Sequence, residues 1–196
     1  FCAGNGAVGL FASSRTQARI ISVEIQERLA DMAERSVQLN GLEEQMRVIC
    51  DDLKNMPAHI QGSKVDMILC NPPYFKVDPY SNLNESEHYL LARHEIATNL
   101  EEICRSAQSI LKSNGRLAMV HRPDRLLDIL DMLQRHNLAP KRLQFVYPKR
   151  EKEANMLLIE AIKDGSTSGF KVLPPLIVHN DDGSYTPEIQ EIYYGS

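Results

Sequence analysis

The chain has 196 residues, of which 43% are hydrophobic, and its formal net charge is −4. A chain of this length buries roughly two thirds of its unfolded surface, so we expect a folded domain with a substantial core. The acidic balance excludes a general attraction to nucleic acid, and any such partner would have to be held by a local basic patch.

Membrane and export signals are missing from the sequence. No apolar run approaches the ~18 residues needed to span a bilayer, and no basic-then-apolar leader opens the chain. We therefore expect a cytoplasmic protein that does not span a membrane. The chain starts at Phe1 rather than methionine, so we also expect its natural N-terminus to lie before this residue.

Short apolar runs alternate with amphipathic stretches, which is typical of an α/β fold with a mostly parallel sheet. In the first half we expect strands at 19–25, 46–52 and from Val65, with helices at about 8–17 and 26–40. Apolar residues at spacings of three and four mark the second helix, and an Asn-Gly pair ends it. The Pro- and Gly-containing segment up to Ser63 is expected to be a loop.

The second half begins with a polar loop from Lys76 to about His88, a length at which loops tend to be either functional or disordered. After it we expect a helix ending at Asn114-Gly115, a strand at 116–122, a helix at 126–136, and strands at 141–149 and 154–163. The last connection is too short for a crossover helix, so these two strands should form an antiparallel hairpin. We therefore divide the chain into a domain, 1–165, and a C-terminal extension, 166–196, that forms a hairpin or edge element.

A glycine-rich loop, Gly4-Asn5-Gly6-Ala7-Val8-Gly9, opens the first helix and matches the pattern G-x-G-x-x-G. Its glycines permit a tight turn and let a ligand approach the backbone. Glu24 ends the next strand, where an acidic residue binds ribose hydroxyls in nucleotide-binding folds. A glycine-rich turn followed by a surface glutamate would have the same sequence pattern. The position of both features directly after predicted strands favours a nucleotide-binding site instead.

Dinucleotide enzymes and S-adenosylmethionine enzymes both use this layout. Asp51 and Asp52 end the following strand, where a carboxylate can accept a hydrogen bond from an adenine amino group. The antiparallel hairpin predicted at the end of the sheet also differs from a purely parallel dinucleotide fold. Both features favour S-adenosylmethionine as the cofactor.

The stretch Asn71-Pro72-Pro73-Tyr74 ends the strand that starts at Val65. The Asn71 side-chain oxygen and the Pro72 carbonyl are two acceptors that could hold one NH₂ group, while Tyr74 offers a flat face for stacking. Holding a conjugated amine in this way makes its nitrogen more tetrahedral and aligns it with a methyl donor. A proline-rich strand terminator is the plain alternative, but the agreement with Glu24 and Asp52 favours the chemical interpretation.

Together, GNGAVG, SVE, CDDL and CNPPYF resemble the class I S-adenosylmethionine methyltransferases that modify exocyclic amino groups through an [Asn/Asp/Ser]-Pro-Pro-[Tyr/Phe/Trp] motif. Within that group the chain is most similar to the bacterial tRNA1(Val) adenine-37 N6-methyltransferase-like family, with its methyltransferase small domain. The resemblance implies a Rossmann-like class I methyltransferase fold. Its mostly parallel seven-stranded sheet would end in an antiparallel hairpin, and its first strand would lie largely before Phe1.

The resemblance also implies roles for individual residues. Cofactor-binding residues would be Gly4, Asn5, Gly6, Gly9, Glu24, Ile25, Asp51, Asp52, Leu53 and Asn71. Within this set, Asp52 is preferred to Asp51 as the adenine ligand. The catalytic residues would be Asn71, Pro72, Pro73 and Tyr74. The predicted substrate-binding residues are Tyr74 and Phe75 in and after this motif and, from local positive charge rather than from the resemblance, Arg93, His94, Lys149 and Arg150.

Adenine in RNA, in particular tRNA, is the leading substrate. A base must be flipped out or already unpaired to enter such a pocket, and an anticodon loop supplies unpaired bases. Arg93 with His94, and the basic segment at 149–152, are the candidate phosphate contacts. No metal is expected, because the four cysteines are far apart, with no C-x-x-C pair and no histidine at ligand spacing.

Three alternatives remain at this point. A protein glutamine N5-methyltransferase acting on a translation factor shares the Asn-Pro-Pro-Tyr motif, but an aliphatic residue usually replaces Phe75 there, and the tail beyond Phe170 has no counterpart. A site-specific DNA methyltransferase would need a separate target-recognition domain. A catalytically silent cofactor-binding module would not need Asn71, which is intact.

Overall fold

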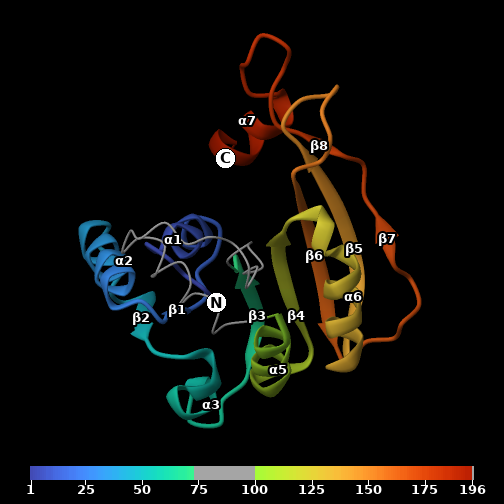
Figure 1. Cartoon of the computed structure of the whole chain (residues 1–196). Helices are drawn as coiled ribbons and strands as arrows, with labels where there is room; N and C mark the ends of the chain where they lie inside the picture. Colours follow the sequence, from blue (N-terminus) through green and yellow to red (C-terminus); the bar gives the residue numbers. More distant parts are fainter. Residues whose placement is uncertain (73–99, 196) are drawn as a thin grey trace, which may run out of the picture.

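The computed structural model describes residues 1–72 and 100–195 (Figure 1). The predicted site residues Pro73, Tyr74, Phe75, Arg93 and His94 lie outside these ranges, as does the polar loop at 76–88. Among the described helices, none combines the length and apolar character that a membrane-spanning segment requires.

Helices and strands alternate along the chain as expected for an α/β fold. The first half contains α1 (Ala7–Ser13), β1 (Ile20–Glu24), α2 (Glu27–Leu39), β2 (Met46–Cys50), the 3₁₀-helix η1 (Leu53–Asn55), α3 (Met56–His59) and β3 (Val65–Cys70). The second half contains α5 (Leu100–Ile110), β4 (Leu111–His121), the 3₁₀-helix η3 (Pro123–Arg125), α6 (Leu126–Arg135), β5 (Leu138–Tyr147) and β6 (Met156–Lys163). The tail contains β7 (Lys171–Val172), β8 (Leu176–Ile177) and α7 (Pro187–Tyr194).

The strands form a mixed arrangement of two sheets. β1 and β2 pair in parallel, and a six-stranded sheet has the order β3-β4-β6-β5-β7, with β8 also paired to β5. β3 runs parallel to β4, whereas β6 is antiparallel to both β4 and β5. The predicted terminal antiparallel hairpin is thus confirmed as β5 and β6.

Residues 1–3 lie between the two sheets. The terminal nitrogen of Phe1 donates to the Leu69 carbonyl at 2.7 Å, and the Ala3 N–H donates to the Val23 carbonyl at 2.9 Å. These residues form no regular strand, so the described sheet is interrupted here and the predicted seven-stranded sheet is not fully seen. The two hydrogen bonds nevertheless place β1 and β3 on either side of the same three residues.

The core lies between the six-stranded sheet and the helices α5 and α6, which cover one of its faces (Figure 1). The sheet contributes alternate residues such as Leu117, Met119, Leu157 and Ile159, because successive side chains point to opposite faces. The helices contribute fully buried residues at helical spacing, including Ile103 and Ile129. Burying each such side chain contributes about 1.5–3 kcal/mol, so this face dominates the stability of the fold.

Two element boundaries differ from the prediction. The helix expected to reach Asn114-Gly115 ends at Ile110, and β4 begins at once with Leu111. The Asn-Gly pair instead makes an irregular turn within β4: Asn114 has a φ of 62°, and a Cβ on Gly115 would lie 2.8 Å from the Lys112 carbonyl oxygen. Asn-Gly pairs occur both at helix ends and at irregular positions within strands, because both contexts require a residue with positive φ. The second difference is that the segment expected as a loop up to Ser63 contains η1 and α3.

The described part of the tail, 166–195, pairs with the outer edge of β5. β7 and β8 run parallel to this strand, and an isolated antiparallel bridge joins His179 to Tyr185 around a turn. The helix α7 that follows was not predicted. Thr186 caps it by accepting a hydrogen bond from the Ile189 N–H, and Pro187 occupies its first position.

Candidate functional site

A cavity of about 290 Å³ lies at the carboxyl ends of β1, β2 and β3. Parallel strands bring their carboxyl ends to one edge of a sheet, so side chains distant in sequence meet here. The predicted site residues in its lining are Gly4, Asn5, Glu24, Ile25, Asp51, Leu53, Asn71 and Pro72. Cys2, Ala3, Ala7, Val8, Val23, Gln26 and Leu29 complete the wall.

The three glycines of the loop have different surroundings. Gly4 has a φ of 55°, and a Cβ there would meet no atom within 4 Å, so this glycine borders open space. A Cβ on Gly6 would lie 3.1 Å from the Ala33 Cβ, and one on Gly9 would lie 2.9 Å from the Ser22 Oγ. Gly6 and Gly9 are therefore packing glycines that bring the loop and α1 against neighbouring elements, and they are not part of the cavity wall.

Glu24 is a buried carboxylate at the end of β1. Its Oε2 accepts a hydrogen bond from the Gly4 N–H at 2.7 Å, and its Oε1 accepts one from the Gln26 N–H at 3.1 Å. An ionised carboxylate offers about four acceptor positions, so about two remain for a ligand. Glu24 thus fixes the glycine loop and still presents acceptors for hydroxyl groups in the cavity.

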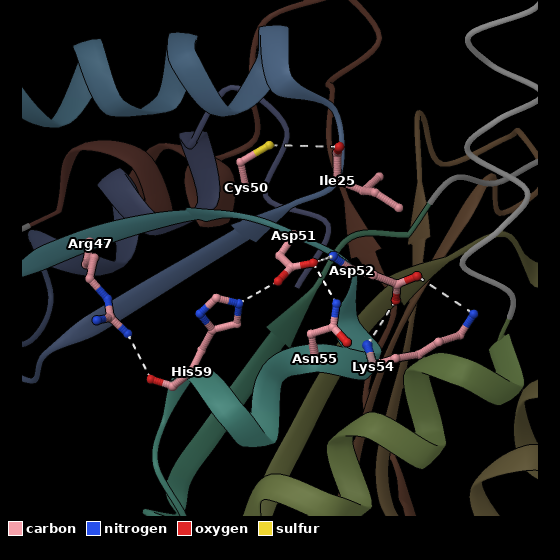
Figure 2. A network of polar contacts seen from close by, with 8 residues as sticks. All are labelled: Ile25, Arg47, Cys50, Asp51, Asp52, Lys54, Asn55 and His59. Carbon is pink, nitrogen blue, oxygen red and sulfur yellow. Dashed lines mark hydrogen bonds and ion pairs between the residues drawn. The ribbon is translucent and has the colours of Figure 1, made fainter.

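Asp51, at the end of β2, is held by three donors. Its Oδ1 accepts hydrogen bonds from the Asp52 N–H at 2.7 Å and from Asn55 Nδ2 at 2.8 Å. Its Oδ2 lies 2.6 Å from Nε2 of His59, as Figure 2 shows. These hydrogen bonds, the one with His59 first, lower the pKa of Asp51 to about 2, so the cavity wall carries a fixed negative charge.

Asp52 makes different contacts from Asp51. Its Oδ1 caps η1 by accepting from the Lys54 N–H at 2.9 Å, and its Oδ2 lies 3.7 Å from Lys54 Nζ (Figure 2). Asp52 is not among the cavity-lining residues, whereas Asp51 is. The preference for Asp52 as the adenine ligand is therefore not supported by the position of the two side chains.

Asn71 and Pro72 follow directly after β3. Asn71 is exposed, Pro72 is buried, and both line the cavity. Asn71 also borders a second, more apolar hollow of about 360 Å³ that lies over β3, β4, β5 and β6. Asn71 therefore lies between the two hollows, and Pro72 lines the first of them.

Cys2 is a wall residue that sequence reasoning did not assign to the site. A hydrogen bond with the Cys70 thiol and burial raise the pKa of Cys2, which keeps this thiol neutral. A neutral thiol is a poor nucleophile, so Cys2 shapes the wall rather than reacting. His59 and Asn55, which support Asp51, were also missed, because no motif connects them to that residue.

Lys149 and Arg150 lie at the turn between β5 and β6, away from the cavity lining. Lys149 Nζ donates to the Asp181 carbonyl at 3.1 Å, and Arg150 is exposed. These two residues are thus brought next to the tail and not into the cavity.

The cavity wall suits a nucleoside-like ligand. Glu24 offers acceptors for hydroxyl groups, Asp51 offers one for an amino group, and Ile25, Leu29 and Leu53 are apolar surfaces against which a planar ring could pack. Gly4 leaves room where a side chain would fill the space. Within the residues the structure covers, no cluster of three His, Cys, Asp or Glu is arranged to hold a metal ion.

Two known proteins are similar to this chain over most of its length. A tRNA1(Val) (adenine(37)-N6)-methyltransferase of Porphyromonas gingivalis (strain ATCC BAA-308 / W83) is 28% identical over 189 residues, which cover 94% of this chain and 73% of the relative. A crystal structure described as a predicted O-methyltransferase, protein Atu636 from Agrobacterium tumefaciens, superposes with a TM-score of 0.75 at 22% identity. That superposition covers 98% of this chain and 86% of the other.

A second structural match concerns a more distant protein. Geranyl diphosphate C-methyltransferase from Streptomyces coelicolor A3(2), in complex with Mg²⁺, geranyl diphosphate and S-adenosyl-L-homocysteine, gives a TM-score of 0.60 at 13% identity. It covers 83% of this chain and 68% of that one. The fold is therefore the α/β methyltransferase fold with a mixed sheet.

The family model described as conserved hypothetical protein 95 matches residues 1–124. These residues contain the glycine loop, Glu24, Asp51 and Asn71, so the match includes the whole described cavity wall. The chain belongs to the family conserved hypothetical protein 95.

Proposed function

We propose that this protein is an S-adenosylmethionine-dependent methyltransferase that methylates an exocyclic amino nitrogen, namely N6 of an adenine in tRNA. The observation that carries the proposal is the meeting of Glu24, Asp51 and Asn71-Pro72, from three strand ends, around one cavity. The name of the Porphyromonas gingivalis relative supports the choice of adenine and tRNA. Such a substrate would place the enzyme in the cytoplasm.

S-adenosylmethionine would be held by the chain's own donors and acceptors. Glu24 accepts from the ribose hydroxyls, and Asp51 accepts from the adenine amino group. Ile25 and Leu53 pack against the adenine ring, while Gly4 and Asn5 border the methionine part. Once bound, the cofactor supplies an electrophilic methyl group. In this proposal residues 1–3 are the end of the central strand of a seven-stranded sheet.

Asn71 and Pro72 position the accepting amine. The lone pair of an amine attached to an aromatic ring is delocalised, so the free amine is a weak nucleophile. When the Asn71 side-chain oxygen accepts one N–H and the Pro72 carbonyl accepts the other, the nitrogen becomes more tetrahedral and its lone pair more available. Pro72 has no N–H of its own and a restricted φ, which keep its carbonyl at a set angle. Pro73 and Tyr74 complete the motif as the predicted support and stacking face.

The test is methyl transfer from radiolabelled S-adenosylmethionine to total tRNA or to purified translation release factors, with full-length protein. We expect label in tRNA that lacks only this modification, at an adenine N6. Label in the release factors alone would instead identify a protein glutamine N5-methyltransferase. Asn71→Ala should bind the cofactor normally by calorimetry and transfer no methyl group, whereas full turnover by this variant would refute the role of Asn71.

A further inference from the structure

Aromatic rings from α1 and the tail form one continuous exposed group. The Phe11 ring on α1 lies 6.1 Å from that of Tyr193 on α7, centroid to centroid. Tyr193 in turn lies 5.7 Å from Tyr185 and 6.1 Å from Tyr194, and Tyr185 stacks on His179 at 5.1 Å. We call Phe11, His179, Tyr185, Tyr193 and Tyr194 the aromatic strip.

The strip remains open to solvent. Phe11 is 62% exposed, Tyr193 49% and Tyr194 78%. Of the five Phe and seven Tyr in the whole chain, four belong to this one surface. Rings that served only to attach α7 to α1 would be buried by the attachment, and the outermost of them are not.

A basic turn lies next to the strip. Between β5 and β6 it carries the cationic Lys149, Arg150 and Lys152, together with the acidic Glu151 and Glu153. The turn is fixed to the tail by the His179 N–H, which donates to the Pro148 carbonyl at 3.1 Å, and by Lys149 Nζ, which donates to the Asp181 carbonyl. Three cationic side chains therefore lie near the His179 end of the strip, among the acidic Glu151, Glu153, Asp181 and Asp182.

The other end of the strip, Phe11, lies on α1, the helix whose first residues line the candidate cavity. Arg15, just after α1, donates to the Ile192 carbonyl at 2.7 Å and so joins this helix to α7. α1 begins with Ala7 and Val8, which line the cavity wall. Figure 1 shows α7 between α1 and the ends of β5 and β6 that carry the basic turn.

We infer that the aromatic strip binds unpaired bases of an RNA substrate by stacking, while the basic turn contacts the adjoining phosphates. Each ring offers a π-face to any base, and such stacking contributes about 1–3 kcal/mol per base. The acidic Glu188 and Glu191 are exposed on α7 and repel phosphate, so bases rather than the RNA backbone face this helix. The inference rests on the proposed function, because it assumes that RNA approaches Asn71 from this side.

The test compares binding of unmodified tRNA by full-length variants, using fluorescence anisotropy. Tyr194→Ala should weaken tRNA binding at least fivefold, whereas Tyr194→Phe, which keeps the ring, should bind as the wild type does. Leu127→Ala is the matched control, because Leu127 is 81% exposed on α6 and should not affect binding. Calorimetry should give the same affinity for S-adenosylmethionine in all four proteins.

Three other results would each contradict a different statement about the aromatic strip or the proposed function. Unchanged tRNA affinity of Tyr194→Ala would refute the strip as an RNA surface, even if the wild type methylates tRNA. A lower melting temperature of Tyr194→Ala without loss of tRNA affinity would make the rings structural. Wild-type protein that binds tRNA through Tyr194 without methylating it would refute the proposed function, while the strip would remain an RNA-binding surface.

Discussion

Nε2 of His59, at the end of α3, lies 2.6 Å from Oδ2 of Asp51, at the end of β2. This contact fixes a carboxylate whose other oxygen already accepts two hydrogen bonds. The Asp51 side chain therefore cannot rotate without breaking several bonds, and it faces the cavity before any ligand arrives. Such preorganisation lowers the entropy lost on binding.

His59→Ala should weaken S-adenosylmethionine binding about tenfold, because one hydrogen bond to a charged group, roughly 1.5 kcal/mol, no longer orients Asp51. Calorimetry measures the affinity. Arg47→Ala is the control: among the described residues its guanidinium donates to the His59 main-chain carbonyl at 3.4 Å, and not to the Asp51 carboxylate. Equal losses in both variants would indicate that α3 was disturbed as a whole.

Asp51→Ala and Asp52→Ala should separate two roles that adjacent residues fill. Asp51 lines the cavity, so its substitution should lower cofactor affinity at least tenfold. Asp52 caps η1, so its substitution should cost about 1 kcal/mol of stability and leave affinity nearly unchanged. Calorimetry measures the cofactor affinity, and urea unfolding measures the stability. A loss of affinity in the Asp52 variant, with the Asp51 variant unaffected, would support Asp52 as the adenine ligand.

His121 should make stability depend on pH. Burial lowers its pKa below the ordinary 6.5, because the charged form is disfavoured at the end of β4. The unfolded chain then binds the proton more readily, so stability is fully present above pH 6.5 and falls as the pH drops through the folded pKa. Melting temperatures from pH 7.5 to 5 should decline less steeply in His121→Gln. Parallel curves for both proteins would contradict this assignment.

Gly4→Ala and Gly41→Ala form a matched pair. Both glycines have positive φ, 55° and 63°, and a Cβ at either would meet no atom within 4 Å. Each substitution should cost about 1 kcal/mol of stability through backbone strain. Only Gly4→Ala should also weaken cofactor binding, because only Gly4 lines the cavity. Equal cofactor affinity in the two variants would exclude Gly4 from the binding surface.

Gly6→Ala should be more damaging than either of these. Gly6 combines a φ of 89° with backbone and side-chain atoms of Ala33 within 3.3 Å of the added methyl group. Strain and overpacking together should cost about 2–4 kcal/mol. Urea unfolding provides the measurement, and Ala33→Gly should recover part of the loss by making room. Absence of any recovery would indicate that strain alone is responsible.

The strands and long helices could be predicted because the spacing of their apolar residues indicates which side chains are buried. α2 shows this well: Ala30, Ala33 and Val37 recur at helical spacing and are all buried. The four-residue α3 could not be predicted in this way, because it is shorter than any periodic signal. α7 did have a local signal, Thr186-Pro187, which matches a helix cap followed by proline at the first position.

Within the site, motifs identified which strand ends matter but not which neighbour faces the ligand. Asp51 and Asp52 are chemically equal in the sequence, and the choice between them depends on a cap that Asp52 makes to η1. Likewise, G-x-G-x-x-G does not distinguish Gly4, which borders the cavity, from Gly6 and Gly9, which pack against other elements. Those distinctions arise from tertiary contacts, which a linear pattern does not contain.

The placement of residues 1–3 between β1 and β3 has a consequence for mutational tolerance. Neighbouring strands lie about 4.8 Å apart, so the backbone bonds from Ala3 to Val23 and from Phe1 to Leu69 hold the Glu24 and Asn71 sides of the cavity roughly two strand widths apart. This separation is set by main-chain atoms that every residue type except proline possesses. Substitutions of the side chains at residues 1–3, other than to proline, should therefore leave the spacing between the two sides of the site unchanged.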